Sequence, residues 1–176
     1  MDRHALPLRD EAGPEEPGAV HRPIRVALAE EHDAMRHTLR HLLEHEPDFE
    51  VIADAADLET IVRDTGAQRP QVLVLDLSLS RGSSFQTIEL MREWMPATEI
   101  VVVTMSDDPS IAQRVLEAGA IGYVRKEIAD AELPRAVRRA ARGEGHVGND
   151  IAPDMMPGTA GAVGVGPSPS EQDLRG

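Results

Sequence analysis

Five short apolar runs, separated by stretches with helical periodicity, constrain the fold of this 176-residue chain more than any other feature. The runs cover about residues 24–29, 49–53, 72–76, 99–104 and 121–124. Between the first two runs, apolar side chains recur at the spacing of one helical face: Met35, Leu39, Leu42 and Leu43. Strands that alternate with helices predict a parallel sheet, because neighbouring parallel strands need a crossover connection.

Four further helices are expected, at about residues 58–64, 85–94, 109–119 and 132–142. Ser83 or Ser84 can cap the start of the second of these helices. Asp107 or Asp108 can cap the start of the third. Pro134 is expected in the first turn of the last helix, where a missing N–H is tolerated.

The central runs are continuously apolar, as expected of strands covered by helices on both faces. With right-handed crossovers, five such units predict a flavodoxin-like (βα)5 doubly wound parallel sheet with strand order 2-1-3-4-5. We expect this folded domain to span residues 24–143. Residues 1–23, rich in proline and acids, are expected to form a disordered arm. Residues 144–176, rich in Gly, Pro and Ala, are expected to be a flexible tail or a truncated linker.

Composition excludes several classes of protein. Against 31 Asp and Glu residues the chain has only 18 Lys and Arg residues, a poor basis for neutralising nucleic-acid phosphates. It has no cysteine, which excludes disulfides and thiolate chemistry. No apolar run approaches the roughly 18 residues of a membrane span, and no signal peptide is evident. We therefore expect a cytoplasmic protein with no membrane partner.

Polar residues stand where four of the apolar runs end. Asp76 ends the third run and Thr104 the fourth, while Lys126 follows the fifth. The pair Glu30-Glu31 follows the first. Because the carboxyl ends of parallel strands meet at one edge of a sheet, these groups should converge. Carboxylates packed together repel, by roughly 4 kcal/mol per pair at about 4 Å, and a bound Mg²⁺ would relieve this.

Such a site can accept a phosphoryl group. Asp76 is the expected nucleophile toward a phosphodonor and would form an acyl phosphate. Mg²⁺ and the ammonium of Lys126 would neutralise charge on the transferring group. The hydroxyl of Thr104 would then bond a phosphoryl oxygen and draw in the loop after the fourth strand. The residues therefore predict a phosphorylation switch.

The folded region resembles a response-regulator receiver domain of two-component signalling, in particular the NarL/FixJ-like group. The matching segments are residues 24–31, 72–79, 101–104 and 118–126. The resemblance implies phosphorylation of Asp76 by a histidine kinase, with Thr104 and Tyr123 as switch residues and Lys126 as the phosphate-binding lysine. It implies Mg²⁺ ligation by Glu30, Glu31, Asp76 and the backbone carbonyl of Ser78. Two candidate homodimer surfaces follow: the face of the fourth helix, fifth strand and fifth helix, or the first and last helices.

Several positions depart from the family pattern. The second acid of the pair is commonly Asp, whereas this chain has Glu31, whose extra methylene displaces the carboxylate from a cation that demands short distances. Ser80 and Ser84 stand where Pro and Gly are frequent, and Glu127 where many receivers have proline. Residues 166–175 resemble the segment that opens a helix-turn-helix output domain, so the chain is either a stand-alone receiver or a truncated regulator. We expect no direct DNA binding by these residues.

Two alternative functions remain open. The same fold can act as a phosphorylation-independent interaction module, which the departures at Glu31, Ser80 and Ser84 favour. A phosphohydrolase of the haloacid dehalogenase type also uses an aspartate at a strand end, with a second aspartate two positions on. Ser78 occupies that second position and argues against the enzyme. We therefore expect a signalling protein rather than an enzyme.

Two rows of side chains at helical spacing have simpler explanations than a functional site. His37, His41 and His45 repeat every four residues opposite the apolar face of their helix, which is typical of a solvated surface. Four arginines lie on the last helix: Arg135, Arg138, Arg139 and Arg142. Cationic side chains are favoured near a helix C-terminus, although a docking or dimer surface is the functional alternative.

Overall fold

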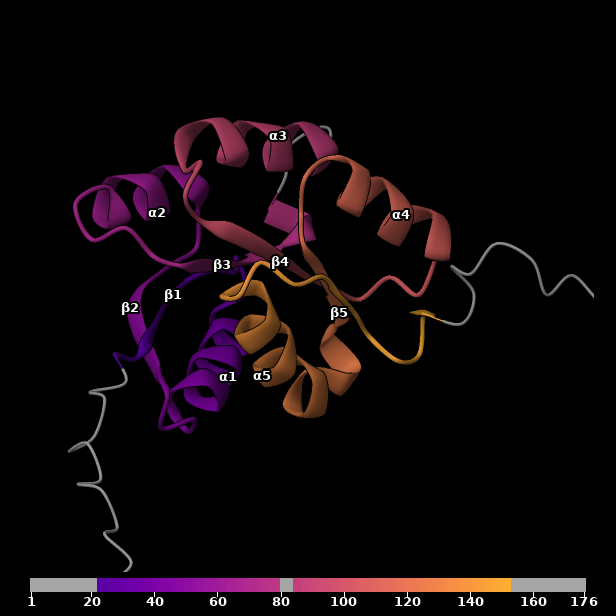
Figure 1. Cartoon of the computed structure of the whole chain (residues 1–176), viewed down its shortest axis with the longest axis horizontal. Helices are drawn as coiled ribbons and strands as arrows, with labels where there is room; N and C mark the ends of the chain where they lie inside the picture. The colour runs from indigo at the N-terminus through magenta and orange to yellow at the C-terminus, as the bar shows by residue number, and fades with distance from the viewer. Residues whose placement is uncertain (1–21, 80–83, 153–176) are drawn as a thin grey trace, which may run out of the picture.

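The computed structural model of this chain describes residues 22–79 and 84–152 (Figure 1). The strands are β1 (Ile24–Ala29), β2 (Phe49–Ala55), β3 (Val72–Asp76), β4 (Glu99–Thr104), β5 (Gly122–Arg125) and β6 (His146–Val147). The α-helices are α1 (Asp33–Glu44), α2 (Leu58–Thr65), α3 (Ser84–Trp94), α4 (Pro109–Glu117) and α5 (Ala129–Ala140). Two 3₁₀ helices, η1 (Leu77–Leu79) and η2 (Lys126–Ile128), follow β3 and β5.

Some sequence predictions fall outside the described residues. They concern most of the N-terminal arm, the positions of Ser80 and Ser83, and the tail beyond residue 152. These stay predictions.

The strands form one parallel sheet in the order β2-β1-β3-β4-β5-β6. The predicted order 2-1-3-4-5 is confirmed, and β6 adds a short edge strand beside β5. β3 lies between β1 and β4, and all of its residues are buried. Its last residue, Asp76, is therefore held at the centre of the sheet edge.

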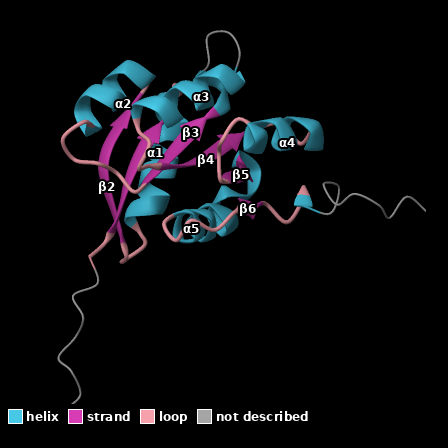
Figure 2. Cartoon of the chain, turned by 45° about the horizontal axis from the view of Figure 1, so that its top comes forward, coloured by secondary structure: helices cyan, strands magenta, loops and turns pink. Residues whose placement is uncertain are grey.

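Helices cover both faces of the sheet, α1 and α5 on one and α2, α3 and α4 on the other (Figure 2). Alternate side chains of β1 pack into the two hydrophobic cores, one on each face of the sheet. Val26 and Leu28 pack with the side chains of α1 and α5, whereas Ala27 and Ala29 pack with those of α2, α3 and α4. The continuous apolar runs are explained by this double burial.

The folded unit extends beyond the predicted boundary at residue 143. His146 and Val147 pair with β5, and the N–H of Gly148 donates to the carbonyl of Tyr123 at 2.9 Å. Ile151 is only 2% exposed and belongs to the core under α2, α3 and α4. The polar, glycine-rich composition of residues 144–152 gave no indication of the two-residue strand β6 or of the buried side chain of Ile151.

Helix α5 begins at Ala129, three residues before the predicted start, so Pro134 lies in its interior. The helix continues directly from η2, and the N–H of Ala129 bonds to the carbonyl of Lys126. Both Leu133 and Pro134 are buried, so packing offsets the lost backbone hydrogen bond.

Helix α4 starts as expected, because the carboxylate of Asp108 accepts from the N–H of Ser110 at 2.8 Å.

None of the helices in the described ranges is long and apolar enough to cross a membrane.

Candidate functional site at the carboxyl edge of the sheet

The residues predicted to converge come from four neighbouring elements. Asp76 and Thr104 are the last residues of β3 and β4. Glu30 directly follows β1, and Lys126 directly follows β5. Because β1, β3, β4 and β5 are adjacent and parallel, these four residues lie along one edge of the sheet.

Asp76 is almost fully buried, with 1% of its surface exposed. Its Oδ2 accepts a hydrogen bond from the hydroxyl of Ser78 and lies 3.0 Å from Nζ of Lys126. Its Oδ1 accepts from the backbone N–H of Ser78 at 3.1 Å. Burial alone would raise the pKa of this carboxyl, but the Ser78 hydrogen bonds and the Lys126 ammonium together lower it below the usual value. Asp76 is therefore an anion at neutral pH despite its burial.

Lys126 bridges two buried carboxylates. Its Nζ lies 2.7 Å from Oε2 of Glu30 and 3.0 Å from Oδ2 of Asp76, and its side chain is only 6% exposed. Glu30 is fully buried, and its Oε1 accepts from the backbone N–H of His32 at 2.9 Å. A single ammonium can contact both acids, which offsets their repulsion.

The predicted acidic pair is split by the structure. Glu30 joins Asp76, whereas Glu31 is exposed to solvent. His32 approaches the cluster instead, with its Nδ1 3.2 Å from Oε1 of Glu30. One ligand atom each from Glu30, His32 and Asp76 fall within 4.8 Å of one another. The sequence analysis did not predict that His32 belongs to this cluster. The only sequence feature that points to it is its position two residues after Glu30, with Glu31 between them.

Thr104 and Tyr123 both contact Ser106, in the loop between β4 and α4. The backbone N–H of Ser106 donates to Oγ1 of Thr104 at 3.2 Å. The hydroxyl of Tyr123 donates to the carbonyl of Ser106 at 2.9 Å. Tyr123 is fully buried, and this burial raises the pKa of its phenol. The two predicted switch residues are thus coupled through the backbone of one loop residue, which the sequence did not reveal.

The donor atoms of this edge fit a divalent cation. Oε2 of Glu30 is buried, and among the described residues its one polar contact is with the Lys126 ammonium, 2.7 Å away. Oδ1 of Asp76 is held by a single backbone N–H. Carboxylate oxygens with spare acceptor capacity are the ligands that hard divalent cations prefer.

Residues 26–138 match the family described as the response regulator receiver domain. This chain belongs to that family. The oxygen regulatory protein NreC of Staphylococcus epidermidis is 35% identical over 134 residues, which cover 76% of this chain and 62% of NreC. The transcriptional regulatory protein DegU of Brevibacillus brevis is 28% identical, over 76% of this chain and 56% of DegU. The chain therefore spans about three fifths of the length of these curated relatives.

Solved structures agree with the fold of this receiver. A two-component response regulator of the LuxR family from Aurantimonas is 32% identical, with a TM-score of 0.70, over 76% of this chain and 95% of that one. The receiver domain of a response regulator named NarL from Mycobacterium tuberculosis, 24% identical with a TM-score of 0.64, supports the fold alone; the match covers 70% of this chain and 99% of that one. The predicted resemblance to NarL/FixJ-like receivers is confirmed, and the curated relatives are named as regulatory proteins rather than enzymes.

Proposed function

We propose that this receiver accepts a phosphoryl group on Asp76 from the phosphohistidine of a histidine kinase and passes on a conformational change. The observation that carries the proposal is the geometry of Asp76: a buried, ionised carboxylate at a strand end, 3.0 Å from the ammonium of Lys126. A buried anion held against a cation is poised to act as a nucleophile toward phosphorus.

The two oxygens of Asp76 have different roles in this proposal. Oδ2 is occupied by Ser78 and Lys126, whereas Oδ1 meets only the backbone N–H of Ser78. Oδ1 would form the new O–P bond as the P–N bond of the donor breaks and the departing imidazole takes up a proton. Lys126 would offset the negative charge on the transferring group.

Mg²⁺ is the cation that the family resemblance implies, with Glu30, Glu31, Asp76 and the carbonyl of Ser78 as the residues that would hold it. When bound, it would supply positive charge to the phosphoryl oxygens. Glu31 is solvent-exposed, so its carboxylate is free to turn toward the edge of the sheet.

The output of the switch would run through Ser106. Once Asp76 is phosphorylated, the hydroxyl of Thr104 would bond a phosphoryl oxygen and give up its contact with the N–H of Ser106. Because Tyr123 is hydrogen-bonded to the carbonyl of the same residue, its ring would be coupled to that movement. The loop between β4 and α4 would thus change conformation.

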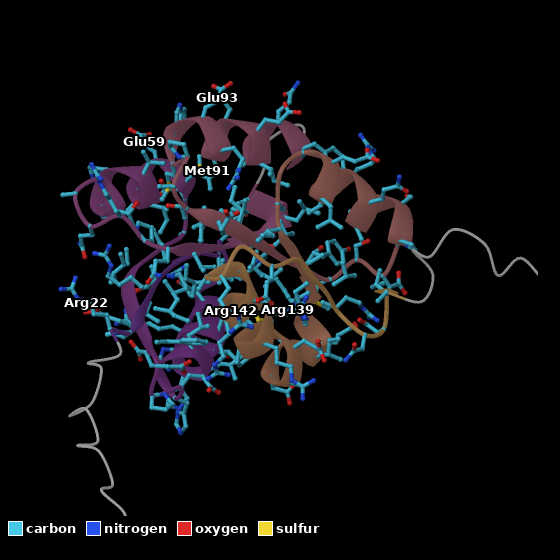
Figure 3. The ribbon with its side chains drawn as sticks, viewed as in Figure 1. Arg22, Glu59, Met91, Glu93, Arg139 and Arg142 are labelled. Carbon is cyan, nitrogen blue, oxygen red and sulfur yellow. The ribbon has the colours of Figure 1, made fainter. Side chains whose placement is uncertain are left out.

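The expected partners of this receiver in the cytoplasm are a histidine kinase and a second copy of the chain. One candidate dimer face is formed by α1 and α5, which lie side by side on the sheet. Arg139 on α5 and Arg142, just beyond its end, are both exposed (Figure 3). The other candidate dimer face is that of α4, β5 and α5. Met105, in the loop between β4 and α4, is 58% exposed beside Thr104.

A phosphorylation-independent interaction module is the second candidate. Two observations favour it: Glu31 lies outside the cluster, and the hydroxyl of Ser78 already occupies Oδ2 of Asp76. Both would weaken cation binding and slow phosphorylation.

Intact-mass measurement after incubation with acetyl phosphate and Mg²⁺ separates the two candidates. We expect the parent protein to gain one phosphoryl group and the Asp76→Asn variant to gain none. Asp130→Asn, at an exposed position of α5, is the matched control and should be labelled like the parent. An unlabelled, folded parent beside a labelled reference receiver would favour the interaction module.

A further inference from the structure

The cluster at Asp76 contains an imidazole nitrogen as well as carboxylates. Nδ1 of His32 lies 3.2 Å from Oε1 of Glu30, and the ligand atoms of Glu30, His32 and Asp76 fall within 4.8 Å of one another. Two ligands on one six-coordinate ion, each about 2.1 Å from it, lie roughly 3 to 4 Å apart. The three side chains therefore need to move by only about an ångström to share one metal ion.

The backbone on either side of this cluster is fixed. The N–H of Glu30 donates to the carbonyl of Ala55 at 3.0 Å, and the side chain of Arg36 donates to the carbonyl of Glu30 at 2.8 Å. The N–H of His32 is bonded to Oε1 of Glu30 at 2.9 Å. This turn keeps the side chains of Glu30 and His32 together while Glu31, between them, is exposed.

Resting on the function proposed above, we propose that the site takes a first-row transition-metal ion such as Mn²⁺ more tightly than Mg²⁺, with the imidazole of His32 as a ligand beside Glu30 and Asp76. Mg²⁺ gains little from a nitrogen donor, because it demands oxygen ligands at short, near-octahedral distances. Imidazole suits the later first-row transition-metal ions best, while Mn²⁺ favours oxygen ligands and accepts an imidazole nitrogen beside them. The Lys126 ammonium repels any divalent ion equally, so it does not discriminate between metals.

His32 is also free to serve as a ligand. Its side chain is 71% exposed, so the ring can turn from its contact with Glu30 toward a metal at little cost. The same exposure means that its substitution leaves the core intact. His37 on α1 is likewise exposed but lies outside the cluster, which makes it a matched control.

Two measurements on the metal-free full chain test the proposal, with Mn²⁺ as the probe. Electron paramagnetic resonance of free Mn²⁺ gives the dissociation constant, and electron spin echo modulation detects nitrogen bound directly to the ion. We expect nitrogen modulation in the parent and in His37→Ala, and none in His32→Ala. Mn²⁺ affinity should fall about tenfold or more in His32→Ala, as when a metal site loses a supporting group. Mg²⁺ affinity should be nearly unchanged.

Glu31→Gln is the third variant, because the alternative metal site would use the carboxylate of Glu31 as a ligand in place of the imidazole of His32. Nitrogen modulation should persist in this variant. Absent nitrogen modulation in the parent, or equal Mn²⁺ affinity in the parent and His32→Ala, would overturn the proposal. Acetyl phosphate labelling of His32→Ala with Mg²⁺ keeps the two proposals apart. If the parent is phosphorylated but His32→Ala binds Mn²⁺ as the parent does, only the ligand role of His32 is rejected. If the parent is not phosphorylated, the phosphoacceptor role of Asp76 is rejected.

Discussion

Lys126 is the residue on which the charge balance of the site depends. It lies between Glu30 and Asp76, both almost fully buried. Removing one partner of a buried ion pair leaves uncompensated charge, which typically costs about 3–5 kcal/mol. We expect Lys126→Met to lower the free energy of unfolding by about 3 kcal/mol in metal-free buffer near neutral pH, measured by urea denaturation. Arg142→Met, at an exposed position just after α5, should change the free energy of unfolding by less than about 0.5 kcal/mol. Equal effects of the two variants would contradict the bridging role.

Ser78 controls the acidity of the proposed phosphoacceptor. Its hydroxyl and its backbone N–H both donate to Asp76, and each lowers the pKa of that carboxyl against the effect of burial. Ser78→Ala removes the hydroxyl and keeps the N–H, so the pKa of Asp76 should rise relative to the parent. Titration of the Asp76 side-chain carbon by ¹³C NMR in metal-free buffer measures this change. Ser106→Ala, near Thr104, is the control and should leave the pKa of Asp76 unchanged.

The convergence of Glu30, Asp76, Thr104 and Lys126 was predictable from the strand ends, but their detailed contacts were not. Asp76, Thr104 and Lys126 stand where apolar runs stop, and parallel strands bring such positions together. Glu30 and Glu31 follow the same run, and no sequence rule decides which of two adjacent side chains turns inward once the strand has ended. The turn before α1 directs Glu30 and His32 to the cluster and leaves Glu31 exposed.

The long buried strands were predictable from the sequence, and the short edge strand β6 was not. β1, β3 and β4 match their predicted ranges, because each is a continuous apolar run covered on both faces. β6 has only two residues, and tertiary contacts hold it. His146 lies 2.8 Å from a carboxylate oxygen of buried Glu132, and Asp150 lies 3.0 Å from Arg125. Such contacts leave no periodic signal in a sequence.

Ile151 anchors this C-terminal segment to the core, so shortening the Ile151 side chain should destabilise the whole receiver. It is 2% exposed and packs in the same core as Tyr123. Ile151→Ala should lower the free energy of unfolding by about 2–4 kcal/mol, as expected for a large-to-small change in a packed core. Urea denaturation measures the loss, with Met105→Ala at a 58% exposed position as the control. A loss as small as that of the control would show that residues 146–152 contribute little to stability.

Arg138 joins α5 to the segment between α1 and β2, two parts of the molecule that are far apart in the chain. Its guanidinium donates to both carboxylate oxygens of Asp48, at 2.8 and 2.7 Å, and it also contacts Glu46. The two partners are 90 residues apart in the chain, so this bidentate contact ties the helices on one face of the sheet together. The hydrogen bonds from Arg138 are the main cause of the lowered pKa of Asp48.

This contact predicts the direction of a pH effect on stability. Because the pKa of Asp48 is lower in the folded than in the unfolded chain, the contact stabilises the fold above the ordinary pKa of an aspartate. The contribution is lost as the pH falls through the folded pKa. Both side chains are partly exposed, 33% for Arg138 and 42% for Asp48, so solvent screening limits the effect to about 1 kcal/mol. Asp48→Asn should therefore be about 1 kcal/mol less stable than the parent near pH 7, with the difference shrinking toward about pH 3.

Urea denaturation of both proteins across this pH range, repeated in high salt, measures the effect. Glu50→Gln, exposed on β2, is the matched control and should show no such convergence with the parent. High salt should reduce the Asp48→Asn difference near pH 7, because the ion pair is accessible to screening. A difference that stays constant from neutral to acidic pH would mean that the side chain of Asp48 acts through packing rather than through its charge.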